Sequence, residues 1–285
     1  MPNPRMKPPD MGLTEQEAAY MPVVERFKPF TLTMGEHVLK YNLFIPETTE
    51  QALPLVVFMH DMGTVSEQTD RTLKQGIGAL VWADPEEQKK RPCFVLAPQY
   101  EEKSAHDDYT VGWSAEATVE LIREICRRYP VDMNRIYGTG QSMGTMMLCE
   151  LLIRHPHFFA GCFLTAGQWD PERMAAVKDE HLWIMVSEHD GRAFPIMGQC
   201  MESIEAAGGH VARGHVDAKA DEKTKAAFCQ AVLKQKADIQ FTWLDKDSVL
   251  VENAPDFPAV HHMCTWKWAY LFEPVREWLF GQRLA

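Results

Sequence analysis

The sequence lacks any long apolar segment. No stretch of its 285 residues approaches the roughly 18 consecutive apolar residues that a membrane-spanning helix needs. The first ten residues, Met1 to Asp10, also lack the apolar core of a secretory signal peptide. These absences predict a cytoplasmic protein, or a mature secreted form whose signal peptide has been removed, and they argue against a membrane as a partner.

Positive charge is also scarce. The chain carries 29 Lys and Arg residues against 40 Asp and Glu residues, which gives a formal net charge of −11 at pH 7. A chain of that sign is repelled by phosphate backbones and anionic lipids, so nucleic acid is not expected as a partner. The sequence does not indicate an oligomeric state.

Metal-binding patterns are missing as well. The seven cysteines are an odd number without metal-ligand spacing, and Cys93, Cys149 and Cys162 fall in apolar runs that predict buried thiols. Histidines and acids gather in three places, but none repeats a recognised ligand spacing. We therefore expect neither a metal nor another cofactor. The three places are His106-Asp107-Asp108, His155-Pro156-His157, and His210 with His215.

Apolar runs alternate with helix-prone segments along most of the chain. This alternation predicts an α/β fold with a mostly parallel sheet and helices on both faces, after an antiparallel hairpin at Phe27–Ile45. We expect a single domain over residues 23–285, preceded by a loosely packed arm at residues 1–22. The expected later strands are Leu55–Met59, Phe94–Ala97, Arg135–Tyr137, Gly161–Gly167, His181–Ser187 and Asp238–Leu244, and the expected helices include Gln68–Trp82, Ala115–Tyr129, Thr145–Arg154, Pro195–Ala207 and Lys219–Gln235.

The most informative motif is Gly-x-Ser-x-Gly at Gly140, Ser142 and Gly144, between a predicted strand and a predicted helix. Such a sharp turn strains its central residue and lifts that side chain clear of the sheet, while larger residues at the glycine positions would collide. The N–H groups at the start of the following helix favour a developing oxyanion. The motif predicts Ser142 as a nucleophile and the N–H of Met143 as an oxyanion donor; the alternative is an ordinary serine in a glycine-rich turn.

A serine hydroxyl is a weak nucleophile, so it needs a base, and the base needs an orienting acid. Asp190 follows directly after the expected strand His181–Ser187, at the edge where open α/β sheets place their sites. Glu188 is near enough to compete for the same role. The candidates for the base are His261 and His262, in an expected late loop before the last helix, and spacing does not choose between them.

A second oxyanion donor should come from the loop after the strand at Leu55–Met59. This loop begins His60-Asp61-Met62-Gly63. We predict the N–H of Met62 as the donor, with that of Asp61 as the alternative.

Other polar and aromatic residues near the strand ends are candidates for substrate binding. Gln141 precedes the nucleophile, Gln168 and Trp169 follow the expected strand Gly161–Gly167, and Trp113 lies in the region after the expected strand Phe94–Ala97. The aromatic rings would hold a phenolic or sugar ring; ordinary packing is the alternative.

Taken together, these segments resemble an α/β-hydrolase of the esterase group that includes polyhydroxybutyrate depolymerase-like, feruloyl and acetyl xylan esterase-like, and predicted peptidase proteins. The group has an aromatic residue and an Ala-Tyr pair shortly after its catalytic histidine, and Trp266 and Ala269-Tyr270 match this best from His262. The matching segments are Leu55 to Gly63, Phe94 to Tyr100, Val131 to Tyr137, Gly140 to Gly144, Val186 to Asp190, and His262 to Phe280.

The resemblance implies a triad of Ser142, Asp190 and His262 and a hydrolase that works through an acyl-enzyme. A small-molecule carboxylic ester is the expected substrate, and a short peptide is the alternative. Where many relatives have a glycine, this chain has Asp61, which leaves the second oxyanion donor open. A protein of the same fold that binds a ligand without turnover is the alternative of another class, and labelling by a fluorophosphonate distinguishes it.

Overall fold

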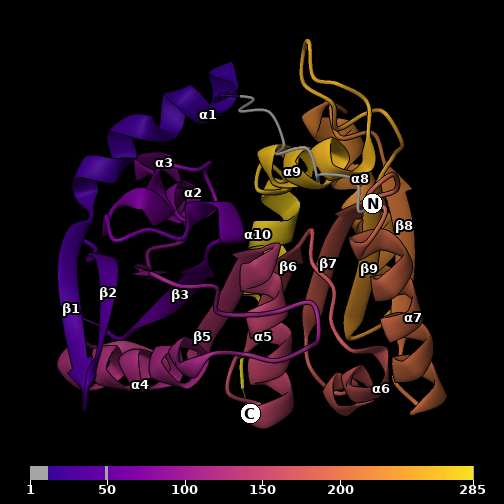
Figure 1. Cartoon of the computed structure of the whole chain (residues 1–285). Coiled ribbons are helices and arrows are strands. Elements are labelled where there is room, and N and C mark those ends of the chain that lie inside the picture. The colour runs from indigo at the N-terminus through magenta and orange to yellow at the C-terminus, as the bar shows by residue number, and fades with distance from the viewer. Residues whose placement is uncertain (1–11, 49–50, 285) are drawn as a thin grey trace, which may run out of the picture.

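A computed structural model describes residues 12–48 and 51–284, so the prediction for residues 1–11 of the N-terminal arm lies outside the described part. At its centre is a nine-stranded sheet in the order β1-β2-β4-β3-β5-β6-β7-β9-β8 (Figure 1). The strands are β1 (Lys28–Met34), β2 (His37–Phe44), β3 (Leu53–Met59), β4 (Phe94–Gln99), β5 (Val131–Gln141), β6 (Gly161–Thr165), β7 (Leu182–Ser187), β8 (Val211–Val216) and β9 (Ile239–Leu244).

The predicted hairpin and the predicted parallel sheet are both confirmed. β1 pairs antiparallel with β2, and β2 pairs antiparallel with β4. From β4 onward every neighbouring pair is parallel. Parallel strands end at the same edge of a sheet, so the segments after β3, β5 and β7 meet there and can build one site.

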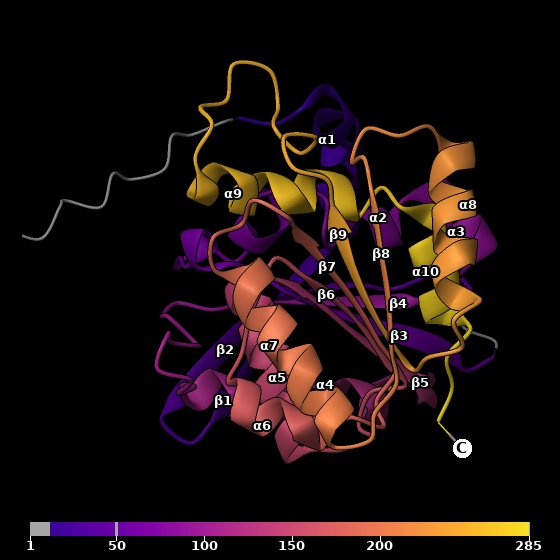
Figure 2. The ribbon, with the colours of Figure 1, turned by 90° about the vertical axis from the view of Figure 1, so that its right-hand side faces the viewer.

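Helices cover both faces of the sheet. α4, α5, α6 and α7 lie on one face, while α3, α8 and α10 lie on the other (Figure 2). The helices are α1 (Glu15–Tyr20), α2 (Leu80–Ala83), α3 (Pro85–Lys90), α4 (Trp113–Arg128), α5 (Met143–Arg154), α6 (Pro171–Met174), α7 (Ala193–Ala206), α8 (Glu222–Leu233), α9 (Pro258–Ala269) and α10 (Glu273–Phe280), with 3-10 turns η1 (Met21–Arg26), η2 (Met62–Thr64), η3 (Arg71–Leu73) and η4 (Ala175–Val177).

The sheet separates two hydrophobic cores. Strand β3 is buried along its whole length, and its side chains alternate between the faces. Leu55, Val57 and Met59 join the core under α4 and α5, and Val56 and Phe58 join the core under α8 and α10. This burial on both faces explains why the central strands are continuous apolar runs that the sequence predicts well.

One predicted helix is wrong, and one strand is missing from the prediction. The segment Gln68–Trp82 is not one helix; it contains η3 and ends in the short α2, because Gly76 has a φ of 110° and interrupts the helix. Strand β8 was not predicted at all. It lies at the edge of the sheet and carries Arg213 and His215 at exposed positions, so it lacks an apolar run.

The described part of the predicted N-terminal arm is helical. Thr14 and Glu17 form a capping box that starts α1. The Glu17 carboxylate is buried and forms a 2.7 Å ion pair with the Nζ of Lys267 in α9. This pair fastens α1 to the segment that carries the candidate base.

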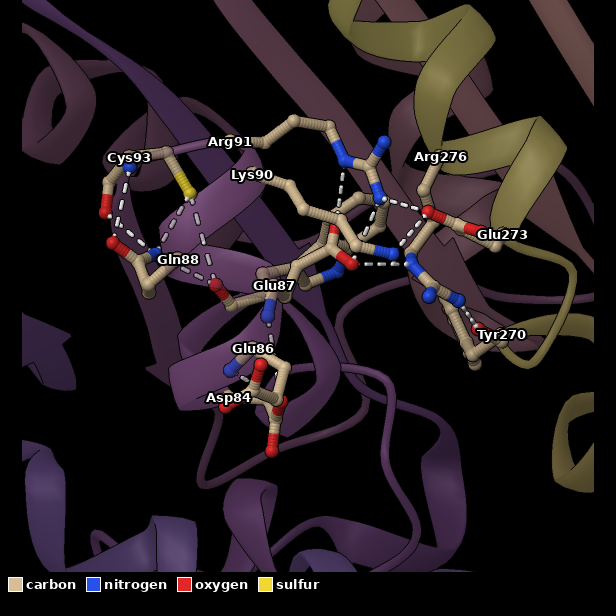
Figure 3. A network of polar contacts seen from close by, with 11 residues as sticks. Asp84, Glu86, Glu87, Gln88, Lys90, Arg91, Cys93, Tyr270, Glu273 and Arg276 are labelled. Atoms are coloured by element: carbon tan, nitrogen blue, oxygen red, sulfur yellow. Dashed lines mark hydrogen bonds and ion pairs between the residues drawn. The ribbon is translucent and has the colours of Figure 1, made fainter.

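A network of charged side chains fastens α10 to α3 (Figure 3). The Arg91 guanidinium bonds to Glu87 at 2.5 and 3.0 Å and to Glu273 at 3.1 Å. On the other side, Arg276 donates to Glu87 at 3.2 Å. Glu87, Arg91 and Arg276 are 5, 12 and 9% exposed, so this network joins the two helices inside the protein.

Within residues 12–48 and 51–284, no helix combines the length and the apolar character that crossing a membrane requires.

Candidate active site

Ser142 lies between the end of β5 and the start of α5 in a strained backbone conformation. Its φ is 52° and its ψ is −113°. A residue with a side chain is disfavoured there by about 1–3 kcal/mol, so the surroundings must hold it. Its N–H donates to the Thr165 carbonyl oxygen at 3.0 Å, and its own carbonyl oxygen accepts from the N–H of Met146 at 3.1 Å. This is the sharp strand-to-helix turn that the motif predicts.

Close backbone packing requires the two glycines that flank the serine. A Cβ on Gly144 would lie 1.9 Å from the carbonyl oxygen of Met59, at the end of β3. A Cβ on Gly140 would lie 2.7 Å from the carbonyl carbon of Gly144. The missing side chains therefore let α5 start directly against β3, which brings the loop after β3 close to Ser142.

Three side chains, from the ends of β5 and β7 and from α9, form a continuous chain of hydrogen bonds. The Oγ of Ser142 is 2.8 Å from the Nε2 of His262, and the Nδ1 of His262 is 2.6 Å from the Oδ2 of Asp190. An ionised carboxylate only accepts, so Nδ1 carries the imidazole proton and Nε2 is left to accept from the serine hydroxyl. The arrangement can take the serine proton at the moment the oxygen attacks a carbonyl.

Asp190 is buried and held in place by the backbone. Its Oδ1 accepts from the N–H groups of Arg192 and Ala193 at 3.0 and 2.9 Å. Burial alone would raise the pKa of the Asp190 carboxyl, but the charge and hydrogen bond of His262 and these two N–H groups together hold that pKa below its ordinary value. The carboxylate therefore stays ionised and stabilises a protonated His262.

The interaction between Asp190 and His262 shifts the pKa of the histidine in the opposite direction, upward. Burial alone would lower the pKa of His262, but the charge and the hydrogen bond of Asp190 outweigh it and raise that pKa above its ordinary value. His262 is thus a stronger base than a free imidazole.

The competing residues lie elsewhere. His261 is fully buried, and its Nε2 is 2.8 Å from the Oδ1 of Asp256, so it does not approach Ser142 in this way. The Oε2 of Glu188 accepts from the N–H of Lys246 at 2.8 Å. One expectation is wrong: both histidines lie inside α9 and not in a loop before it, because the helix starts at Pro258, a residue that suits the first turn.

Two backbone N–H groups near Ser142 are candidate oxyanion donors. Met143 is the first residue of α5 and Met62 is the first residue of η2, so neither N–H has a partner within its own helical turn. Both residues line the same cavity as Ser142. Asp61 instead caps η2, since its Oδ1 accepts from the N–H of Gly63 at 2.7 Å.

A cavity of about 530 Å³ opens over the three side chains. Its walls combine apolar side chains with charged ones, and most of these lining residues lie outside the motifs that the sequence offers. Arg192 could have been suspected from its place two residues after Asp190, and Met146 from its place one turn after Met143 on α5. The lining residues are Met62, Lys103, Ala105, Asp107, Ser142, Met143, Met146, Gln168, Asp190, Gly191, Arg192, Pro258, Ala259 and His262.

Of the four predicted substrate-binding residues, Gln168 lines this cavity and the other three are not among its lining residues. Gln141 is buried and donates to the Oδ2 of Asp61 at 2.9 Å. Trp169 is buried and donates from Nε1 to the Oε2 of Glu150 at 3.1 Å. Trp113 stacks on His37 with a ring separation of 4.3 Å. A position after a strand does not determine which way a side chain points. Here both tryptophans pack against other parts of the protein and do not line the cavity.

Among residues 12–48 and 51–284, side-chain atoms of the kinds that can bind a metal ion come together next to the triad segments. Atoms of His189, Asp247, Asp256 and His261 lie within 4.8 Å of one another. Asp256 already forms a hydrogen bond with His261, and proton transfer from Ser142 to His262 needs no ion. The three groups of histidines and acids noted in the sequence are not part of this cluster.

The sheet order, the turn at Ser142 and the order of serine, acid and histidine along the chain define an α/β-hydrolase fold. No protein-family model matches the chain, and no curated protein matches it either. Several solved structures do match the chain. A thermostable esterase is 25% identical with a TM-score of 0.74, and the match covers 92% of this chain and 64% of the esterase. The chain therefore spans less than two thirds of that esterase.

Two further solved structures share the fold at lower identity. A ferulic acid esterase is 13% identical with a TM-score of 0.56, over 90% of this chain and 96% of the esterase. An acylaminoacyl peptidase in complex with a chloromethyl ketone is 12% identical with a TM-score of 0.53, over 91% of this chain and 42% of the peptidase. These two likenesses show the α/β-hydrolase fold and no more.

Proposed function

We propose that the protein is a serine hydrolase that cleaves carboxylic esters through an acyl-enzyme. The observation that carries the proposal is the unbroken contact from Ser142 through His262 to Asp190 at the floor of an open cavity. A strained serine, a base within hydrogen-bond reach and an acid that fixes the tautomer of that base are the parts that nucleophilic acyl transfer needs.

In the first half of the reaction, Oγ of Ser142 bonds to the ester carbonyl carbon while Nε2 of His262 takes the hydroxyl proton. The oxyanion accepts from the N–H groups of Met143 and Met62, and Asp190 stabilises the imidazolium. The carbon–oxygen bond to the alcohol then breaks, and the alcohol leaves with the proton from Nε2.

In the second half, a water molecule attacks the acyl-enzyme and gives a proton to Nε2 of His262. The bond from the acyl carbon to Oγ then breaks, the proton returns to Oγ, and the carboxylic acid leaves. The protein is restored with one water consumed, so the cycle needs no cofactor.

Two observations favour an ester over a peptide. Much of the wall around Ser142 is apolar, with Met62, Met143, Met146 and Pro258 as contributors, which suits an uncharged acyl or alcohol group. The thermostable esterase also matches this chain at a higher TM-score than the acylaminoacyl peptidase does. The peptidase likeness keeps peptide hydrolysis as a second candidate.

Labelling and turnover test the proposal together. A fluorophosphonate should label the parent protein and leave Ser142→Ala unlabelled. Esters from a panel of short acyl esters, cinnamoyl esters and acetylated sugars should be cleaved, while the anilide paired with each acyl ester, made from the same acid, should not be cleaved at a measurable rate. Absence of labelling would support a binding protein without turnover, and measurable cleavage of the anilides would support a peptidase.

A further inference from the structure

The loop after β3 contains an acidic residue, Asp61, that is only 4% exposed and close to the candidate nucleophile. None of the ion pairs of the described residues includes it, so its carboxylate is held by neutral donors. Its Oδ1 accepts from the N–H of Gly63 at 2.7 Å and from Nε2 of Gln75 at 2.9 Å. Its Oδ2 accepts from Nε2 of Gln141 at 2.9 Å and from the hydroxyl of Thr64 at 3.2 Å.

These four bonds connect the two halves of the candidate oxyanion hole. Gly63 and Thr64 belong to η2, whose first residue Met62 offers one N–H. Gln141 is the last residue of β5 and directly precedes Ser142. The carboxylate of Asp61 therefore spans from the turn that carries one oxyanion donor to the strand that carries the nucleophile.

The two glutamine amides show that the carboxylate sets their orientation. The Oε1 atoms of Gln75 and Gln141 are buried and have no hydrogen-bond partner within the described part of the chain. Reversing either amide would place its oxygen against the Asp61 carboxylate, where two acceptors repel each other. Both side chains therefore turn their N–H groups toward Asp61, and the two amides hold its carboxylate from opposite segments of the chain.

The backbone of Asp61 is fixed as well. His60 is buried, which lowers the pKa of its imidazole, so the ring is neutral. Its Nδ1 donates to the carbonyl oxygen of Asp61 at 2.7 Å, and its Nε2 accepts from the N–H of Tyr100 at 2.9 Å. The start of the loop is therefore anchored to the end of β4, and the Asp61 side chain fixes the turn η2 that comes next in the chain.

We propose that Asp61 is a positioning residue that holds the N–H of Met62 at a set distance from Ser142, by tying η2 to the nucleophile strand through Gln141. The proposal rests on the proposed hydrolase function. An oxyanion donor acts only when it is preorganised, so a loosened η2 should slow the chemical step more than it weakens substrate binding.

Kinetics on Asp61→Ala test the proposal. Losing one oxyanion donor costs about 10²–10³ in kcat, so we expect a fall of up to that size for an activated ester, with KM changed by less than about threefold. Asp61→Asn keeps one acceptor oxygen and should lose less. Gln141→Ala removes only the bond to β5 and should also lower kcat without a matching rise in KM.

Asp84→Ala is the matched control. Asp84 caps α3 as Asp61 caps η2, since its Oδ1 accepts from the N–H groups of Glu86 and Glu87 at 3.0 and 3.4 Å. It lies away from the cavity, in the network of Figure 3. This variant should lose some thermal stability and keep the kcat of the parent. A kcat of Asp61→Ala within about threefold of the parent, or no lower than that of Asp84→Ala, would overturn the proposal.

Amide hydrogen exchange tests whether Asp61 ties η2 to β5, and this measurement does not depend on turnover. In Asp61→Ala and Asp61→Asn, exchange should quicken in residues 61–75 and at the end of β5, and Asp84→Ala should not have this effect. Unchanged exchange in these segments would overturn the proposed role of Asp61 even if the enzyme is active. Failure of the hydrolase proposal would instead appear as a parent protein that no fluorophosphonate labels, so the two failures are distinguishable.

Discussion

Two clusters of charged side chains in this protein use the same chemistry for different ends. Around Ser142, Asp190 and His262 form an acid–base pair beside a cavity of about 530 Å³ and a strained residue. Between α3 and α10, Glu87 binds Arg91 and Arg276 inside the protein (Figure 3). Each cluster joins segments far apart in the sequence.

The difference lies in what each cluster leaves open. The Glu87 carboxylate is occupied by two guanidinium groups, Arg91 and Arg276, which both donate to it. In the candidate site, the Nε2 of His262 faces a hydroxyl that sits at a cavity wall, so a proton can move there when a substrate arrives. A buried ion pair alone therefore does not indicate a site; an accessible acceptor next to a strained nucleophile does.

The largest expected effect comes from removing the nucleophile. Ser142→Ala should lower kcat for an activated ester by about 10⁶-fold, because the remaining site can supply only a small part of the rate. The thermal denaturation midpoint should stay close to that of the parent, since the substitution removes only the side-chain hydroxyl and leaves the backbone of residue 142 unchanged. Activity within tenfold of the parent would remove Ser142 from the mechanism.

The next largest effect concerns the acid. Asp190→Asn should lower kcat by roughly 10⁴-fold, because an amide cannot hold the imidazole in the required tautomer. Glu188→Gln is the matched control two residues away, and it should keep most of the activity because the Glu188 carboxylate accepts from the backbone N–H of Lys246 and His262 bonds to Asp190 instead. If the control were the crippled variant, the acid would be Glu188.

A change in the second cluster should act on stability and not on rate. Glu87→Gln leaves the buried guanidinium of Arg276 without its carboxylate and Arg91 with Glu273 alone, which should lower the free energy of unfolding by about 3 kcal/mol. The kcat of the folded protein should not change. Denaturant unfolding provides the measurement.

Glu86→Gln serves as the comparison for Glu87→Gln. Glu86 pairs with Lys89 on the same helix, where the two side chains are 75 and 70% exposed. Removing an exposed pair should change the free energy of unfolding by less than about 1 kcal/mol. Equal effects of the two substitutions would show that the buried network does not contribute more than a surface pair.

The smallest effect is a shift along the pH axis. The base must be neutral to act, so kcat/KM should rise with pH and have its midpoint above about 6.5, because Asp190 raises the pKa of His262. In Asp190→Asn the midpoint should move down. Folding stability depends on pH in the opposite sense. The stabilisation that His262 gains from Asp190 is fully present below the pKa of this histidine in the unfolded chain, and it is lost as the pH rises through the raised pKa of the folded protein.

The residues that the sequence identified best are those set by backbone geometry. Gly140, Ser142 and Gly144 are dictated by a tight turn, and a buried parallel strand such as β3 has to be apolar along its length. Ligand-facing side chains were harder to predict. Trp169 and Gln141 stand at strand ends, as expected, but bond to Glu150 and Asp61.

Two further gaps have physical causes. The edge strand β8 has no apolar run, because exposed side chains occupy one face of it. The place of His262 on α9 results from a helix that starts at Pro258, earlier than its aromatic residues indicate. Long-range contacts such as that of Asp61 with Gln141, 80 residues apart, leave no local pattern in the sequence.

Trapping the acyl-enzyme tests the central claim most directly. The parent protein is mixed with an activated ester, quenched in acid within the first turnovers, digested with trypsin and analysed by mass spectrometry. Cleavage after Arg135 and Arg154 gives one peptide, residues 136–154, that contains Ser142. The account predicts that this peptide gains the mass of the acyl group on Ser142 and that His262→Ala abolishes the gain; an acyl group on another residue, or none while hydrolysis proceeds, would contradict it.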